Sequence, residues 1–447
     1  MGTGMTKCEE EKKDEKDMSY PKNEWKAAAA TIAALRESER TTLTVICKRT
    51  PEGDLADPIS VMENAISDMR FDSLSFWNQT LKFPAETQDI MRTLAKLLSS
   101  RKWKKVEFRS CRGTSDANER RRTARLDDDD TLSTVIDCLL HDVSELELKG
   151  SSWLVDQILR ATSEEAARCN VSSSILNSVS VEKHTFLSSA DMIYLFNLPC
   201  DTLQQITICS CRLLEGTNGP VPEATHSNSG LKRLVLSDCP LNGRVDVHAA
   251  ICSILEHNET LEVLSLSQNC LVDEDMVQLI PRLTTHPTLK QMNLSFNRLG
   301  NEFISEFCCS LTKASTRNQC HLEKISLRPN LWSRKVEKVA LLEVMQVNTS
   351  ITYLDSLVGL DRKITEKLRY YCWINRAGRK LTKNPLAEPS ANMTGTTAVS
   401  LGLWPLVLER AGSRGTSYYG DENVEPTART NAVYYILKTM TPVFFVR

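Results

Sequence analysis

Residues 231–241 read LKRLVLSDCPL, residues 261–271 read LEVLSLSQNCL, and residues 289–299 read LKQMNLSFNRL. All three stretches follow the pattern L-x-x-L-x-L-x-x-(N/C)-x-L, with methionine replacing one leucine, and their first residues are 30 and 28 positions apart. A pattern that returns at a nearly constant interval of this length predicts a solenoid, in which each copy is one structural unit stacked on the next.

The pattern assigns a role to each of its fixed positions. Apolar residues alternate around the fourth and sixth positions, which predicts a short strand with one buried face. At the ninth position an asparagine (Asn269, Asn297) is able to hydrogen-bond the backbone of the neighbouring repeat, and the small Cys239 is an accepted substitute. The segments between copies have helical spacing, so each repeat is a strand followed by a helix.

The same register extends on both sides of these copies. Further first positions are Phe71, Trp103, Val143, Leu176, Leu203, Leu322 and Ile351. From the first of these onward, the successive intervals are 32, 40, 33, 27, 28, 30, 28, 33 and 29 residues. We therefore predict about ten repeats. A weaker eleventh strand is expected at residues 43–45 in the same register.

The repeats resemble those of the ribonuclease-inhibitor-like class of leucine-rich-repeat proteins. The spacing, the Asn or Cys at position nine and the helical returns carry this resemblance over residues 71–357. It implies an α/β solenoid shaped as a horseshoe, with a curved parallel sheet on the concave side, helices on the convex side and helical caps at the ends. It also implies a protein ligand, because members of the class bind proteins.

The C-terminal region resembles a narrower, uncharacterised set of repeat proteins. The resemblance rests on NRAGR at 375–379, LWPLVLERA at 403–411 and the V-Y-Y-x-L pattern at 433–437. No activity is assigned to that set, so this resemblance adds to the fold and not to the function.

Composition along the chain predicts four parts. Residues 1–20 form a charged, disordered tail, and the alanine-rich residues 21–40 form a helix that caps the first repeat. The solenoid occupies residues 41–360. Residues 361–447 form a C-terminal helical cap, which begins with a helix over 361–381.

Charge and cysteine content narrow the class of protein. The formal net charge is −2, so we expect no nucleic-acid partner. No apolar run reaches membrane-spanning length, and we expect no integral membrane segment. The 15 cysteines are an odd number without a secretory signal, which predicts buried, reduced thiols in a cytoplasmic protein, with a nuclear location left open. The oligomeric state stays open.

The chain carries none of the common catalytic motifs. It contains no G-x-x-x-x-G-K-[ST], no G-x-G-x-x-G, no G-x-S-x-G and no H-E-x-x-H sequence. The nearest approaches to a zinc pattern are the pair Cys209 and Cys211 and the group Cys308, Cys309, Cys320 and His321, whose cysteines we interpret as core thiols. We therefore expect no enzymatic activity, no cofactor and no metal site.

The N-terminus offers one candidate modification site. Residues 1–6, MGTGMT, satisfy the N-myristoylation pattern with Gly2 as acceptor. A single myristoyl chain anchors a protein to membranes only weakly. The alternative interpretation is an unmodified tail.

The function predicted for this solenoid is that of a non-catalytic intracellular scaffold, which binds a protein partner on the concave sheet. The third, fifth and seventh positions of each repeat face that surface. Exposed Trp, Arg and Tyr residues are favoured anchors of protein interfaces. The candidate partner-binding residues are Trp77, Arg109, Arg233, Lys324, Arg328 and Tyr353.

Two alternative functions remain open at this stage. In the first, the chain is a substrate receptor of a ubiquitin ligase, and the apolar segments 400–411 or 432–446 recruit the ligase. The same segments would otherwise fold back and seal the last repeat. In the second alternative, the chain is a GTPase-activating protein of the nuclear-transport type, although it lacks the acidic C-terminal run usual in that class.

Overall fold

The computed structural model describes residues 42–47, 63, 71–78, 84–110, 129–150, 174–183, 187–196, 198, 202–213, 230–355 and 362–376. By its internal contacts the chain divides into two units, Met1–Thr42 and Leu43–Arg447. Every described residue except Thr42 belongs to the second unit. Outside the described residues lie Gly2, the predicted tail 1–20 and helix 21–40, and the segments 400–411 and 432–446.

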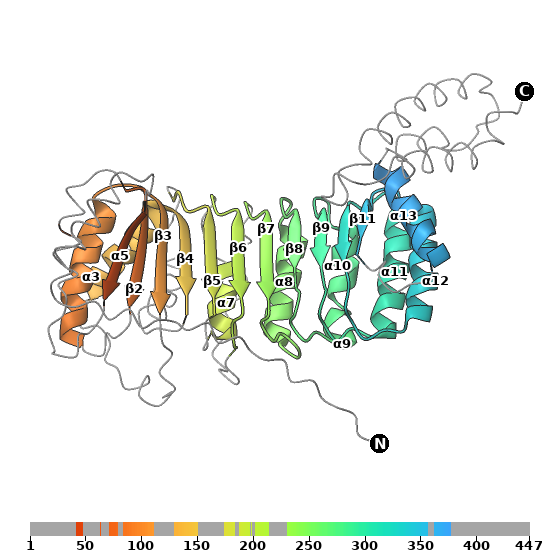
Figure 1. The fold of residues 1–447 in the computed structure, drawn as a ribbon, viewed down its shortest axis with the longest axis horizontal. Coiled ribbons are helices and arrows are strands. Elements are labelled where there is room, and N and C mark those ends of the chain that lie inside the picture. Colours follow the sequence, from red (N-terminus) through yellow and green to blue (C-terminus); the bar gives the residue numbers. More distant parts are fainter. Residues whose placement is uncertain are drawn as a thin grey trace, which may run out of the picture. The chain divides into compact units, whose positions relative to one another are not determined.

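The described residues contain eleven strands that form one open sheet, and the order of these strands in the sheet is their order in the sequence (Figure 1). Neighbouring strands from the second to the eleventh run parallel. The strands are β1 Thr42–Cys47, β2 Ser73–Asn78, β3 Trp103–Ser110, β4 Val143–Lys149, β5 Ser178–Glu182, β6 Gln205–Cys209, β7 Arg233–Ser237, β8 Val263–Ser265, β9 Gln291–Asn293, β10 Lys324–Ser326 and β11 Tyr353–Leu354. The weaker strand expected at 43–45 is present as part of β1.

The helices follow the strands and form a second layer beside the sheet (Figure 1). Parallel neighbouring strands need such a crossover, because the chain must return to the end of the sheet where the strands begin before it starts a new strand. The described helices are α3 Pro84–Ser99, α5 Asp129–His141, α7 Ser189–Phe196, α8 Val245–His257, α9 Asp273–Met276, α10 Leu279–Thr285, α11 Asn301–Thr316, α12 Arg334–Val347 and α13 Arg362–Arg376. The architecture is that of an α/β leucine-rich-repeat solenoid, as the repeat pattern predicts.

The strand register confirms the predicted positions. Leu234 pairs with Leu264, Leu264 with Met292 and Met292 with Ile325, so fourth positions lie beside one another from strand to strand. The sixth positions follow the same register and are buried as well; Leu236, for example, is fully inaccessible to solvent. Burying one leucine side chain stabilises a fold by about 2 kcal/mol, and here the contribution recurs in every repeat.

Ninth-position side chains connect each repeat to the one before it. Asn269 Nδ2 donates to the carbonyl oxygen of Leu236 at 3.0 Å, and Asn297 Nδ2 donates to that of Leu266 at 2.8 Å. Equivalent contacts join Asn330 to Leu294 at 3.0 Å, Cys239 to Ile208 at 3.6 Å and Cys211 to Val181 at 3.7 Å. We refer to these five contacts as the ninth-position ladder. They confirm the roles predicted for asparagine and cysteine.

Asparagine does more in this ladder than cysteine does. Oδ1 of Asn269 accepts the backbone N–H of Cys239 at 2.8 Å, and Oδ1 of Asn297 accepts that of Asn269 at 2.9 Å. Both amides are buried, with at most 6% of the residue exposed. Each asparagine therefore supplies a donor and an acceptor to backbone groups that water does not reach, and a thiol supplies a single weak donor.

A second set of side chains organises the start of each strand. Three residues before the first position, Asn258 Oδ1, His286 Nδ1 and Asn348 Oδ1 accept the first position's backbone N–H at 2.7, 3.1 and 2.7 Å. Burial lowers the pKa of His286, which keeps Nδ1 unprotonated and able to accept. In the same turns Thr260 and Thr288 donate to the first-position carbonyl of the preceding repeat at 3.1 and 3.0 Å.

The eighth position has a left-handed backbone in six successive repeats. The sequence pattern does not predict this feature. In five of these repeats the eighth-position N–H donates to the seventh-position carbonyl of the next repeat, as between Gln268 and Ser295 at 3.0 Å; in the sixth, Phe296 donates to the carbonyl of Pro329 at 2.8 Å. The φ values are 80° at Gly150, 56° at Lys183, 54° at Ser210, 56° at Asp238, 61° at Gln268 and 59° at Phe296. Only one of the six is glycine, so the other five carry a steric cost in exchange for this contact.

Helix α13 covers the last strand. Asn375 Nδ2 donates to the carbonyl oxygens of Asn348 and Ile351 at 3.1 and 2.9 Å, and Leu368 is fully buried. This helix matches the one expected at the start of the C-terminal region. It ends at Arg376 among the described residues.

The prediction that the cysteines are buried thiols is only partly right. Cys211, Cys239 and Cys308 are buried and free, but Cys309 is exposed on α11. The two adjacent residues differ because neighbouring positions in a helix point about 100° apart, so only one of them faces the sheet.

We expect Asn269→Ala to lower the free energy of unfolding by about 2–3 kcal/mol, because it leaves buried backbone groups of the preceding repeat unpaired. Asn269→Cys should lower the free energy of unfolding clearly less than Asn269→Ala does, since a thiol occupies the same position two repeats earlier at Cys211. Urea unfolding followed by circular dichroism measures both. Equal losses for the two variants would show that the ladder bond contributes nothing beyond packing.

We expect Gln268→Gly to raise the free energy of unfolding by up to about 1 kcal/mol, because glycine adopts a left-handed backbone without steric cost. The matched control is Arg298→Gly, at an exposed position that lacks a left-handed backbone; it should lower the free energy by about 1 kcal/mol. Thermal melts of both variants test this pair. A loss of stability in Gln268→Gly would contradict the assignment of strain to the eighth position.

Candidate functional site

The sheet has one side that the helices leave open to solvent. Side chains at the fourth and sixth positions point toward the helices, so those at the third, fifth and seventh positions point to the opposite side. Burial follows this alternation, as in β7, where Arg233 is exposed and Leu234 and Leu236 are buried. We refer to the third-, fifth- and seventh-position side chains together as the sheet face.

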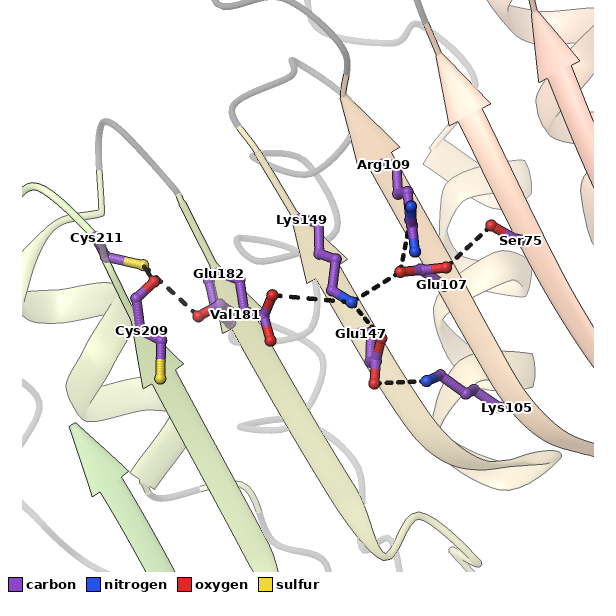
Figure 2. Close-up of polar contacts among 10 residues, drawn as sticks. All are labelled: Ser75, Lys105, Glu107, Arg109, Glu147, Lys149, Val181, Glu182, Cys209 and Cys211. Carbon is purple, nitrogen blue, oxygen red and sulfur yellow. Dashed lines mark hydrogen bonds and ion pairs between the residues drawn. The ribbon is translucent and has the colours of Figure 1, made fainter. Parts of the chain in front are cut away.

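On β3 to β5 the sheet face carries a network of ion pairs (Figure 2). Lys149 Nζ lies 2.9 Å from Glu107 Oε1, 2.9 Å from Glu147 Oε2 and 3.8 Å from Glu182 Oε2. Lys105 Nζ lies 2.6 Å from Glu147 Oε1. One lysine thus bridges carboxylates from three successive strands.

The strand register explains why the network runs diagonally. Glu107 is directly opposite Glu147, and Arg109 is directly opposite Lys149, so like charges face one another across β3 and β4. Like charges directly opposite destabilise a sheet. The pairs Lys105–Glu147 and Glu107–Lys149 relieve this repulsion, because each cation reaches the carboxylate two residues along the adjacent strand.

Glu107 is the most tightly held member of the network. Its residue is 6% exposed, and it contacts Arg109 Nε at 2.7 Å and accepts a hydrogen bond from Ser75 Oγ at 3.0 Å. Burial alone raises the pKa of Glu107, but the hydrogen bonds from Arg109, Lys149 and Ser75 outweigh it and lower the pKa to about 2. The carboxylate therefore stays ionised throughout the physiological range of pH.

From β6 to β9 the fifth and seventh positions of the sheet face carry small, uncharged side chains. Ser237 and Ser267 share a hydrogen bond of 3.0 Å between their hydroxyl oxygens, and Ser295 Oγ donates to Asn293 Oδ1 at 2.6 Å. Cys209 is the seventh-position residue of β6, and Cys211 follows that strand (Figure 2). Burial raises the pKa of the Cys209 thiol to about 11, so it is a poor nucleophile at neutral pH.

The C-terminal part of the sheet face carries cations and an aromatic ring. Arg233 on β7, Lys324 on β10 and Tyr353 on β11 are exposed, and Arg328 just after β10 is half-buried. Asp355 is the acid in this region, and its Oδ1 accepts the backbone N–H of Leu327 at 2.7 Å. Burial raises the pKa of Asp355.

The predicted anchors therefore fall into two groups. Arg233, Lys324, Arg328 and Tyr353 lie together on β7–β11, but Arg109 lies on β3 inside the ion-pair network. Trp77 is in register with Arg109 on β2, and its side chain lies outside what the structure describes. Sequence reasoning missed the network itself. The sequence does contain a signal for it. In the repeats that begin at 103 and 143, a charged residue of one repeat has its opposite charge two positions further along or back in the other, as Lys105 has in Glu147 and Lys149 has in Glu107.

An open cleft of about 330 Å³ lies at the end of the sheet where strands β7–β10 begin. Second-position residues of four successive repeats line it, and their charges alternate: Lys232, Glu262, Lys290 and Glu323. Lys290 Nζ is 3.1 Å from Glu262 Oε1. The charges of this row compensate one another, but Glu259 lines the cleft as well, so the cleft carries one more carboxylate than lysine and does not favour an anionic ligand.

Within the described ranges, no three His, Cys, Asp or Glu side chains gather as a metal site would require. None of the helices in that part of the chain combines the length and the apolar character needed to span a bilayer.

No protein-family model matches the chain. Solved structures with similarity to it include the actin-binding site 2 of leiomodin-1, at 14% identity over 32% of this chain and 82% of that chain, with a TM-score of 0.25. A protein from Bacteroides fragilis is 13% identical over 69% and 82% of the two chains, with a TM-score of 0.36. TLR13 in complex with ssRNA13 is 10% identical over 64% and 35%, with a TM-score of 0.33. At these values the neighbours identify no family, and the repeated strands and helices of the chain itself define its fold.

We expect Glu107→Gln to remove a pH-dependent part of the stability. The pKa of Glu107 falls from its ordinary 4.5 to about 2 in the folded chain. The ionised carboxylate therefore stabilises the fold fully above pH 4.5, and this contribution is lost as the pH falls toward 2. It amounts to roughly 2–3 kcal/mol.

Urea titrations at several pH values between neutral and acid measure this effect. Glu145→Gln is the matched control, since Glu145 occupies the neighbouring strand of the same sheet face and has no ion pair among the described residues. The assignment fails if Glu107→Gln and Glu145→Gln reduce stability equally at neutral pH.

Proposed function

We propose that the chain is a non-catalytic, intracellular protein-interaction scaffold that binds a protein partner on its sheet face. The observation that carries this proposal is the sheet face itself, which presents in-register rows of side chains from at least ten parallel strands while the helices occupy the other side. A continuous surface of this kind suits an extended macromolecular contact.

The two parts of the sheet face contribute differently to such an interface. The ion-pair network on β3–β5 fixes its charged side chains, so these side chains lose little conformational freedom when a partner binds. Exposed Arg and Tyr side chains are favoured interface anchors, and Arg233 and Tyr353 on the C-terminal strands are of this kind. The C-terminal part is thus the better candidate for the contacts that dominate the affinity.

The chemistry around the buried groups supports a role without catalysis. Buried thiols such as Cys138, whose pKa burial raises to about 11, are poor nucleophiles. The ligase-receptor and GTPase-activator alternatives depend on segments or partners outside the described residues. No contact in the described part favours either of them.

Affinity capture from an extract of the source cells tests the scaffold proposal. Gln291→Trp and Thr207→Trp together place two bulky side chains on the half-buried sheet face, and Glu306→Trp with Glu343→Trp makes the matched change on exposed helix positions. Circular dichroism confirms that both double variants fold. Partners should bind the wild type and the helix variant, and be lost from the sheet-face variant.

The opposite pattern, in which the helix variant loses every partner and the sheet-face variant none, would place binding on the helices. It would remove the basis for the proposal.

A further inference from the structure

Third-position residues of β7–β11 form a continuous row across the sheet. The register places Arg233 beside Val263, Val263 beside Gln291, Gln291 beside Lys324, and Lys324 beside Tyr353. Two cations therefore stand on β7 and β10 with two uncharged residues between them. A partly exposed aromatic ring follows on β11.

The two cations of this row, Arg233 and Lys324, have exposed side chains. Among the residues that the structure describes, neither of them forms an ion pair with a carboxylate. By contrast Lys105 and Lys149 lie 2.6 and 2.9 Å from Glu147. A carboxylate from outside is able to approach the β7 and β10 cations directly, whereas on β3 and β4 it must displace an existing partner.

The sheet face is therefore electrostatically divided. On β7–β11 it carries three cations and one acid, a sum of +2; on β2–β5 it carries three cations and four acids, a sum of −1. The second-position residues Lys232, Glu262, Lys290 and Glu323 alternate in sign, so they do not change this difference in net charge. An acidic ligand is steered toward the C-terminal strands and away from the N-terminal ones.

We infer that the third-position row of β7–β11 binds an acidic, extended peptide segment of a partner protein, which lies across the strands and places one carboxylate on Arg233 and another on Lys324. This inference rests on the proposed scaffold function and names the chemistry of its partner. Tyr353 then receives an apolar side chain of the segment beyond the second carboxylate, because a tyrosine ring offers a large rigid contact surface.

Strand geometry sets the spacing of the two acids. Neighbouring strands are about 4.8 Å apart, so three intervals from β7 to β10 span roughly 14 Å. An extended chain advances about 3.4 Å per residue and covers this distance in about four residues. The segment therefore carries Asp or Glu at two positions about four residues apart, followed by an apolar residue.

Selection of short random peptides displayed on phage, with the immobilised full chain as bait, tests the inference. Selected peptides are synthesised with a fluorescent label, and their affinity is measured by anisotropy at about 50 mM and about 300 mM salt. Affinity should fall at the higher salt, because exposed ion pairs are screened. Peptides resynthesised with their two acids adjacent should bind more weakly than those with the spacing given above.

Two charge-reversal variants provide the matched comparison. Arg233→Glu with Lys324→Glu should weaken binding at least about tenfold, the effect of replacing two attractions with two repulsions. Lys367→Glu with Arg369→Glu makes the same change in net charge at exposed positions of α13 and should leave the affinity unchanged. Thermal melts confirm that both variants fold.

Equal weakening by the two variants would mean that the peptides respond only to net charge, and it would overturn the inference. Selected peptides without an excess of Asp and Glu would also overturn it. If such peptides lose binding to a Gln291→Trp variant, the scaffold proposal stands and only the acidic partner is wrong. If neither Gln291→Trp nor the double variant Arg233→Glu with Lys324→Glu changes the affinity of any selected peptide, the sheet face is not the binding surface. Both proposals are then wrong.

Discussion

The contact on which this fold depends is the one between a ninth-position side chain and the sixth-position carbonyl of the preceding repeat. It satisfies a backbone group at the point where the strand ends and the chain turns toward the helix, a place that water does not reach. Because the contact recurs from Cys211 to Asn330, it sets the spacing and register of successive strands. The rows of the sheet face follow from that register.

Most of the fold could be predicted from the sequence, since hydrophobic alternation and repeat period are local signals. The fourth and sixth positions and the ninth-position residues Cys239, Asn269 and Asn297 were all placed correctly. The left-handed eighth position was not, because residues as different as Lys183 and Phe296 occupy it. Its conformation is imposed by a backbone hydrogen bond to the next repeat. Such a contact does not require a particular residue type, so it cannot be recognised from the sequence of one repeat.

Much less of the candidate site could be predicted. The sequence identifies which residues face outward, and so it proposes Arg109 and Arg233 as equivalent anchors. Their environments differ because Arg109 lies 2.7 Å from a buried carboxylate, whereas Arg233 forms no ion pair with any of the described acids. Which cation pairs with which acid depends on diagonal reach between strands, and the pattern of leucines does not encode it. A solenoid fold by itself is compatible with many functions, so the partner must be argued from these side chains.

The ninth-position ladder is uneven along the chain, and this bears on how the molecule comes apart. Its thiol contacts, at 3.6 and 3.7 Å, join β5 to β7, and its amide contacts, at 2.8–3.0 Å, join the strands that follow. In a stack where each repeat touches only its neighbours, cooperativity is limited by the weakest junction. The thiol-joined strands pair over five residues each and the amide-joined strands over three, so the longer backbone pairing offsets the weaker side-chain contact and no junction of the ladder is marked out as the place where unfolding starts.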